Sequence, residues 1–183
     1  MDMVTVVILT KNEEENIVDV IKNAKSLTNN VLIVDSGSVD RTVELAEKNK
    51  AVVIYRNWNN DFAAQRNFAL KYVETEWVMY LDADERMSTD LISNVKKVVN
   101  DDLALYKIER RNNAFGRSFK YGVLGPDSVI RLFPKGKGYW KGKVHERVIC
   151  ELPLKKLCGY IDHYTYKDFD EYLEKMNIYS TIG

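Results

Sequence analysis

The first half of the chain has four short apolar runs, and acidic and polar residues follow three of them. These residues are Thr10, Asn12, Glu13, Asp35, Asp82 and Asp84. Carboxylates gathered in one place repel one another, and burying them is costly unless a positive group joins them. Mg²⁺ or Mn²⁺ suits such an oxygen-rich site, which substrate phosphates typically complete. If the four runs end at one edge of a sheet, these residues predict a nucleotide diphosphate held through a metal ion, with Asp35 free to bind a base or ribose.

The spacing of Asp82 and Asp84 is weak evidence by itself. With 14 Asp in 183 residues, about one Asp-x-Asp arises by chance. A second copy, Asp168-Phe169-Asp170, begins a predicted helix, where acids favour the positive end of the helix dipole. Asp82 and Asp84 instead close a buried strand, and an extended backbone with small Ala83 between them would point both carboxylates the same way.

The elements that position these residues alternate between strands and helices. Residues 4–9, 31–35, 51–55 and 77–82 are continuous apolar runs, as in parallel strands buried on both faces. Helical patterns lie between and after them, with apolar faces at 17–24, 39–46, 64–72 and 91–98. This order predicts a doubly wound, Rossmann-like α/β sheet, in which ligands bind outside the carboxyl ends of the strands.

The second half of the chain has a different pattern. Residues 103–111 and 128–134 look like strands, and residues 135–149 and 157–166 look like further strands or a ribbon. Residues 112–127 form a loop rich in glycine, and residues 167–181 form a closing helix. We expect one domain over residues 1–183, with a first subregion at 1–105 and a smaller, antiparallel subregion at 106–183. The chain stops within the predicted helix, so we expect it to be truncated at the C-terminus.

The net charge of zero conceals a basic segment. Residues 1–106 carry 12 Lys/Arg and 18 Asp/Glu, whereas residues 107–147 carry 11 Lys/Arg and 3 acids. Such a segment suits an anionic ligand, an anionic membrane surface or nucleic acid, although a solvated lysine-rich surface explains the charge equally well. No signal peptide, membrane-spanning run or metal-motif cysteine pair is evident, so we expect a cytoplasmic protein.

Several segments, in order and over nearly the whole chain, resemble family 2 glycosyltransferases with the GT-A fold. They are VVILTKNEEENI, VLIVDSGSVDRTVELA, FAAQRNFAL and WVMYLDADERMS. RLFPKGKGYWKGKVHERV and HYTYKDFDEYLEKMNIYS are similar to the bacterial branch that contains lipopolysaccharide-core β-1,4-glucosyltransferases. Many members of the family carry Glu-Asp where this chain has His145-Glu146.

The resemblance implies that residues 1–105 are the nucleotide-sugar-binding subregion and residues 106–183 the acceptor-binding subregion, and it implies a role for each matching residue. The nucleotide-sugar side comprises Thr10, Asn12, Glu13, Asp35, Gln65, Arg66, Asp82 and Ala83. The implied metal ligands are Asp84 and His163, and the implied acceptor-side residues are Arg131, Trp140 and His145. Glu146 is the implied base for the acceptor hydroxyl, with Asp127 as the alternative, and Glu85 is expected to pair with Arg86 or another basic group.

The resemblance implies a metal-dependent, inverting glycosyltransferase. The donor would be a nucleotide sugar, most simply a UDP-sugar, and the acceptor a saccharide or lipid-linked saccharide of the cell envelope. The basic segment suggests peripheral contact with the inner face of a membrane, and no nucleic-acid partner is expected. Two alternatives stay open: a sugar-phosphate nucleotidyltransferase, whose glycine- and arginine-rich loop is missing after the first strand, and a non-catalytic binder of nucleotides or nucleic acid.

Overall fold

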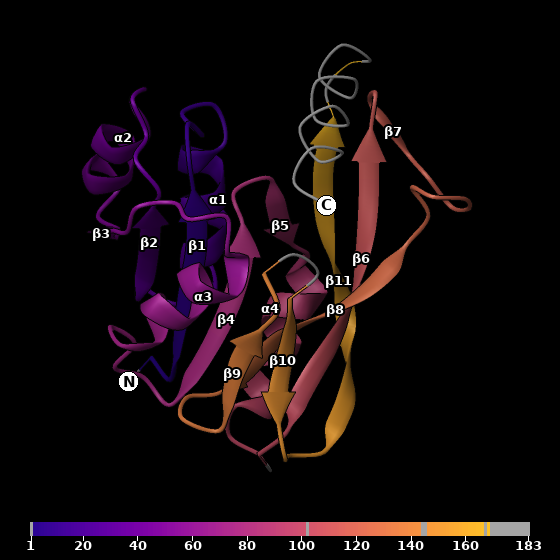
Figure 1. The fold of residues 1–183 in the computed structure, drawn as a ribbon. Helices are drawn as coiled ribbons and strands as arrows, with labels where there is room; N and C mark the ends of the chain where they lie inside the picture. The colour runs from indigo at the N-terminus through magenta and orange to yellow at the C-terminus, as the bar shows by residue number, and fades with distance from the viewer. Residues whose placement is uncertain (1, 102, 144–145, 167, 169–183) are drawn as a thin grey trace.

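A computed structural model of the chain describes residues 2–101, 103–143, 146–166 and 168. His145 and nearly all of the predicted closing helix lie outside these residues. In the described part, one nine-stranded sheet carries the main body of the fold, and a separate two-stranded hairpin packs on it (Figure 1).

The first half confirms the predicted alternation of strands and helices. The strands are β1 (Val4–Thr10), β2 (Val31–Asp35), β3 (Val52–Tyr55) and β4 (Trp77–Asp82). The helices are α1 (Ile17–Lys25), α2 (Thr42–Lys48), α3 (Phe62–Leu70) and α4 (Thr89–Val98). The four strands pair in parallel in the order β3-β2-β1-β4, so their carboxyl ends meet at one edge, as the sequence predicted.

The second half extends the same sheet. Its strands are β5 (Glu85–Met87), β6 (Leu105–Ala114), β7 (Arg117–Ser118), β8 (Asp127–Pro134) and β11 (Leu154–Tyr166), and the separate hairpin consists of β9 (Gly138–Lys141) and β10 (Arg147–Cys150). β8 joins the halves, because it runs antiparallel to both β4 and β6. The predicted loop at 112–127 is partly wrong: β6 continues to Ala114 and a short β7 follows.

Both faces of the central strands are covered. Alternate residues of one face, such as Ile8, Ile33 and Leu81, share a core with α1 and α4. The other face, including Val34 and Tyr80, shares a core with α3 and the β9–β10 hairpin. Burial on both faces explains why the strands read as continuous apolar runs rather than as alternating ones.

Gly159 permits close packing between β11 and the start of α4. Its φ is +97°, and a Cβ there would lie 2.4 Å from the backbone nitrogen of Leu91. Next to it, the hydroxyl of Ser88 accepts hydrogen bonds from the backbone N–H groups of Leu91 and Tyr160. This contact fixes β11, and therefore His163 on it, relative to the chain that follows β4.

Candidate active site

A cleft of about 1240 Å³ lies along the carboxyl ends of β1 and β4 and reaches β6, β8, β11 and the β9–β10 hairpin. Eleven of the fifteen predicted site residues line it: Thr10, Glu13, Gln65, Arg66, Asp82, Ala83, Asp84, Arg131, Trp140, Glu146 and His163. Asn12, Asp35 and Asp127 do not line the cleft. The structure therefore gathers most of the predicted site in one place.

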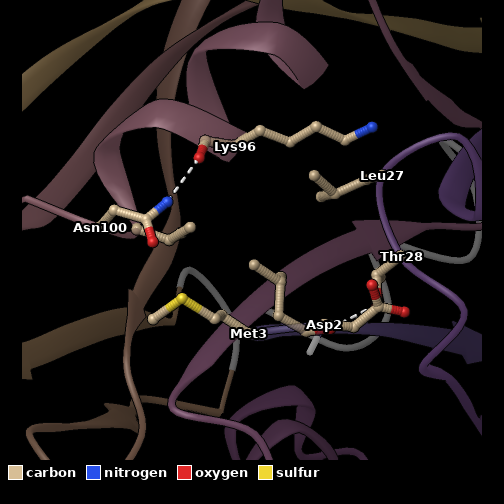
Figure 2. A pocket seen from close by; sticks show the side chains of 8 residues that line it. Asp2, Met3, Leu27, Thr28, Lys96 and Asn100 are labelled. Atoms are coloured by element: carbon tan, nitrogen blue, oxygen red, sulfur yellow. Dashed lines mark hydrogen bonds between the residues drawn. The ribbon is translucent and has the colours of Figure 1, made fainter.

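A smaller hollow of about 250 Å³ lies at the start of β1 (Figure 2). There, the Asp2 carboxylate accepts a hydrogen bond from the backbone N–H of Asn29, at 2.8 Å. Lys96 Nζ donates to the carbonyl of Ser26 at 2.8 Å, and the Asn100 amide donates to the carbonyl of Lys96 at 3.0 Å. The chain itself satisfies these polar groups, so the large cleft is the candidate site.

Asp35 stabilises the turn that follows β2. Its Oδ2 accepts hydrogen bonds from the backbone N–H groups of Gly37, at 2.8 Å, and Ser38, at 2.9 Å. Its Oδ1 accepts from the hydroxyls of Ser38 and Thr10. With 3% of its surface exposed, Asp35 acts as a turn residue in the described structure. The prediction that it binds a base or ribose stays a prediction.

Asn12 joins the loops after β1 and β2. Its backbone N–H donates to the Ser38 hydroxyl, and its side-chain oxygen accepts from the backbone N–H of Val39, both at 2.9 Å. Asn12 has φ +55°, a conformation that asparagine tolerates better than most residues. Asn12 and Asp35 thus shape the rim near Thr10 from outside the cleft.

Gln65 on α3 clamps the other side of this rim. Its amide nitrogen donates to the hydroxyl of Ser36, at 2.8 Å, and to the carbonyl of Arg56, at 3.0 Å. Its amide oxygen accepts from Arg56 Nη1 at 2.8 Å. Trp58 and Phe62, whose ring centroids are 4.7 Å apart, line the cleft beside it.

Four charged residues under the cleft form what we call the arginine cluster: Arg66, Asp82, Glu85 and Arg131. Arg66 Nη2 lies 2.8 Å from Asp82 Oδ1, and Arg131 Nη2 lies 2.5 Å from Asp82 Oδ2. Arg131 Nη2 also lies 2.7 Å from Glu85 Oε1. The partner predicted for Glu85 was Arg86 or another basic group, and the structure gives it Arg131 and, at 3.4 Å, Arg110. Glu85 is fully buried and also accepts the backbone N–H of Asp82.

Arg66 links the arginine cluster to Glu146. Arg66 Nε lies 2.9 Å from Glu146 Oε1, and the Glu146 side chain is 16% exposed in the cleft. The guanidinium lies 4.8 Å from the ring centroid of Trp140, which itself packs edge-on against Tyr80. Trp140 is 5% exposed, so it supports Arg66 from below the cleft.

The surroundings of Asp82 set its charge. Burial acts to raise the pKa of Asp82, but the guanidinium groups of Arg131 and Arg66 outweigh burial and hold the pKa well below its usual range. Asp82 is therefore ionised at any physiological pH. Arg66 Nη1 and Arg131 Nε are buried and have no hydrogen-bond partner among the described residues.

Asp84 lies in different surroundings, which we call the histidine side: Asp84, Asn112 and His163. The chain turns at Ala83–Asp84, so the extended backbone that would point Asp82 and Asp84 the same way is not formed. Asp84 Oδ2 lies 3.4 Å from His163 Nε2, and the carbonyl of Asp84 accepts the backbone N–H of Tyr164. Both side chains are partly exposed in the cleft, 23% for Asp84 and 17% for His163.

The two candidate bases occupy different places. Asp127, at the start of β8, pairs with Arg110 at 2.6 Å and is 46% exposed, outside the cleft. Glu146 lines the cleft and is held by Arg66. The geometry favours Glu146 as the base, and that assignment stays a prediction.

Sequence reasoning missed several residues of the site: Trp58, Phe62 and Arg110 line the cleft, whereas Arg56 and Asn112 lie outside it and contact Gln65 and His163. The sequence pattern did contain a signal for Arg110 and Asn112. Ile108, Arg110 and Asn112 alternate along β6 and share one face of the sheet, but treating residues 112–127 as a loop hid the continuation of that strand. Trp58 and Phe62 precede and begin α3, where nothing in the local pattern distinguishes a cleft aromatic from a packed one.

Comparison with known proteins identifies the family. A family model described as glycosyl transferase family 2 matches residues 5–151. The chain belongs to glycosyl transferase family 2. An uncharacterized glycosyltransferase of Rickettsia typhi is 26% identical over 99% of this chain and 66% of its own length. The lipopolysaccharide core biosynthesis glycosyltransferase LpsC of Rhizobium meliloti is 28% identical over 83% of this chain and 60% of its own length.

Solved structures confirm the GT-A fold of this family 2 chain. Staphylococcus aureus TarS (residues 1–349) superposes with a TM-score of 0.61 at 16% identity, over 98% of this chain and 64% of TarS. The mannosyltransferase PcManGT from Pyrobaculum calidifontis, solved with GDP-Man and Mn²⁺, gives a TM-score of 0.50 at 22% identity, over 61% of this chain and 35% of its own. The chain spans at most about two thirds of the length of the curated relatives named above.

Proposed function

We propose that the chain is the catalytic part of a metal-dependent, inverting glycosyltransferase. It moves a hexose from a nucleotide sugar, in the first instance a UDP-sugar, to a saccharide or lipid-linked acceptor in cell-envelope glycan synthesis. The observation that carries the proposal is the cleft at the strand ends, where the Asp84–His163 pair and Glu146 face one space. The name of LpsC supports the cell-envelope acceptor.

The residues on the histidine side fit a divalent metal. A carboxylate and an imidazole nitrogen, 3.4 Å apart and both reached from the cleft, are two ligands of a shell that diphosphate oxygens and water can complete. The imidazole favours Mn²⁺ over the harder Mg²⁺, and PcManGT was solved with Mn²⁺. When bound, the metal would stabilise the negative charge on the departing diphosphate.

The protein side chains supply the other needs of the reaction. Glu146 takes the proton of the acceptor hydroxyl, whose oxygen attacks the anomeric carbon as the bond to the nucleoside diphosphate breaks. Arg66 holds Glu146 by a charge-assisted hydrogen bond of 2.9 Å, which fixes the position of the carboxylate. Lys11 and Arg147 are exposed in the cleft and are available to the diphosphate or to an anionic acceptor.

The acceptor side also carries a basic, aromatic loop. In residues 115–124 the exposed cations are Arg117 and Lys120, there is no acid, and Tyr121 and Val123 are 87% and 102% exposed. The chain turns back at the end of β6, and this loop projects sideways from the sheet at the right of Figure 1. It fits contact with a lipid-linked or anionic acceptor at a membrane surface. No helix among the described residues is long and apolar enough to span a bilayer.

The experiment measures thermal unfolding with UDP-, GDP- and ADP-sugars, each with and without Mn²⁺, because a ligand that binds only the native state raises the unfolding temperature. One UDP-sugar should stabilise the protein only with Mn²⁺, and Asp84→Asn should abolish that shift. Asp90→Asn, on the exposed face of α4, is the matched control. Full transfer and full Mn²⁺ dependence in Asp84→Asn would reject the metal assignment.

A further inference from the structure

Asn112, on β6, contacts both His163 and the loop that follows β6. Its side-chain nitrogen donates to the carbonyl of Gly125 at 2.9 Å, and its side-chain oxygen lies 2.8 Å from His163 Nδ1. Its backbone carbonyl accepts the N–H of Phe119. With 7% of its surface exposed, Asn112 is buried between the imidazole and the loop.

These contacts fix the proton on the imidazole. The carbonyl of Gly125 can only accept a hydrogen bond, so it selects the nitrogen of the Asn112 amide. The oxygen of that amide then faces His163 Nδ1, and because an amide oxygen can only accept, Nδ1 must carry the hydrogen. In the neutral ring the lone pair is therefore on Nε2, which faces the cleft residue Asp84.

The contact between His163 Nε2 and Asp84 Oδ2 is long. At 3.4 Å it is longer than a charge-assisted hydrogen bond, for which about 2.7–2.9 Å is usual. A lone pair and a carboxylate oxygen that face each other repel, and a cation bound to both removes the repulsion. Histidines that bind metals almost always donate their second ring N–H to a carbonyl or carboxylate, as His163 does.

We propose that Asn112 is a positioning residue: it holds His163 in the Nδ1–H tautomer, presents Nε2 to the metal, and ties this metal ligand to the loop at residues 115–126. The proposal rests on the metal site of the proposed function. It implies that one side chain orders both a metal ligand and part of the acceptor side.

Three substitutions separate the two roles of Asn112. Asn112→Leu removes both side-chain contacts. Asn112→Asp keeps an acceptor for His163 Nδ1–H but cannot donate to the carbonyl of Gly125. Asn100→Leu, at an exposed amide on the chain after α4, is the matched control.

The first measurement is Mn²⁺ binding, with and without UDP, by electron paramagnetic resonance of free Mn²⁺. Asn112→Leu should bind Mn²⁺ about 10–100-fold more weakly than the unsubstituted protein, whereas Asn112→Asp and Asn100→Leu should bind it nearly as well. If the unsubstituted protein binds Mn²⁺ and Asn112→Leu binds it equally well, the role of Asn112 is wrong but the metal site stands. If the unsubstituted protein binds no Mn²⁺, both proposals fail.

The second measurement needs no metal. The chain contains 2 His, so ¹⁵N spectra of the imidazole rings at mildly alkaline pH can be assigned with a His145→Gln variant. His163 should show the Nδ1–H tautomer, and Asn112→Leu should lose this preference. An Nε2–H tautomer in the unsubstituted protein would overturn the proposal.

The third measurement tests the tie to the loop. Hydrogen exchange across residues 115–126 should accelerate in Asn112→Leu and in Asn112→Asp, because neither can donate to Gly125. Unchanged exchange in both variants would reject the link to the loop.

Discussion

The arginine cluster and the histidine side lie at opposite ends of Asp82-Ala83-Asp84, yet they use the same residue type in opposite ways. Asp82 lies between two arginines that are 3% and 5% exposed. Asp84 faces one histidine at 3.4 Å, in the open cleft. The first carboxylate is saturated by fixed positive charge, and the second has room for another ligand.

From this difference we expect the Asp-x-Asp motif to bind its metal through Asp84 and not through Asp82. A carboxylate that already bridges two guanidinium groups gains little from a cation, because its charge is neutralised and its oxygens are occupied. We therefore expect the arginine cluster to maintain the cleft and to hold Glu146, and the histidine side to bind the metal.

The largest expected effect is on stability, and it is confined to the arginine cluster. Asp82→Asn removes the carboxylate between Arg66 and Arg131 and leaves each arginine with its other carboxylate partner, so the free energy of unfolding should fall by about 3 kcal/mol, the lower end for a broken buried ion pair. Asp84→Asn should change it by less than about 1 kcal/mol. Urea unfolding at neutral pH measures both. Equal losses of unfolding free energy in the two variants would contradict the difference between the arginine cluster and the histidine side.

The same contrast should appear in the pH dependence of unfolding. Because the folded-state pKa of Asp82 is depressed, its contribution to stability is present above the unfolded pKa of about 3.9 and is lost as the pH falls below that value. The difference in unfolding free energy between the unsubstituted protein and Asp82→Asn should therefore shrink below about pH 4. Urea midpoints from neutral to acidic pH test this, and a constant difference would contradict it.

A smaller effect, on the rate of glycosyl transfer, tests whether the arginine cluster holds the catalytic base, which we propose is Glu146. Glu146→Gln keeps a partner for Arg66 but removes the proposed base, so the transfer rate should fall at least about 100-fold. Asp127→Asn, outside the cleft, should stay near the unsubstituted rate. Initial rates with saturating donor and Mn²⁺ distinguish them, and the reverse order would make Asp127 the base.

The smallest expected effect concerns the exposed pair between Asp127 and Arg110. Because Asp127 is 46% exposed, solvent screens the pair, and Asp127→Asn should cost about 0–1 kcal/mol of unfolding free energy. Urea unfolding at low and high salt checks both the size and the screening. If Asp127→Asn lowered the unfolding free energy as much as Asp82→Asn does, Asp127 at the start of β8 would have to be counted in the arginine cluster.

Much of the site could be predicted because its positions depend on local pattern. Thr10, Asp35 and Asp82 end apolar runs, and parallel strands bring such ends to one edge. Arg66 was predicted from the resemblance of FAAQRNFAL to the family, and it is buried on α3. Asn112 was missed because the predicted loop began two residues before β6 ends.

The sequence by itself determined the family, the α/β alternation and the edge of the sheet at which the polar residues meet, because these depend on periodicity and on chain order. Only the tertiary structure decided which charges pair. Arg131 lies 49 residues from Asp82, and Glu146 lies 80 residues from Arg66. Such contacts depend on how β8, α3 and the β9–β10 hairpin pack, and the turn at Ala83–Asp84 sends two neighbouring acids into different surroundings. Their roles follow from those surroundings, since burial and the nearest charge set what a carboxylate can bind.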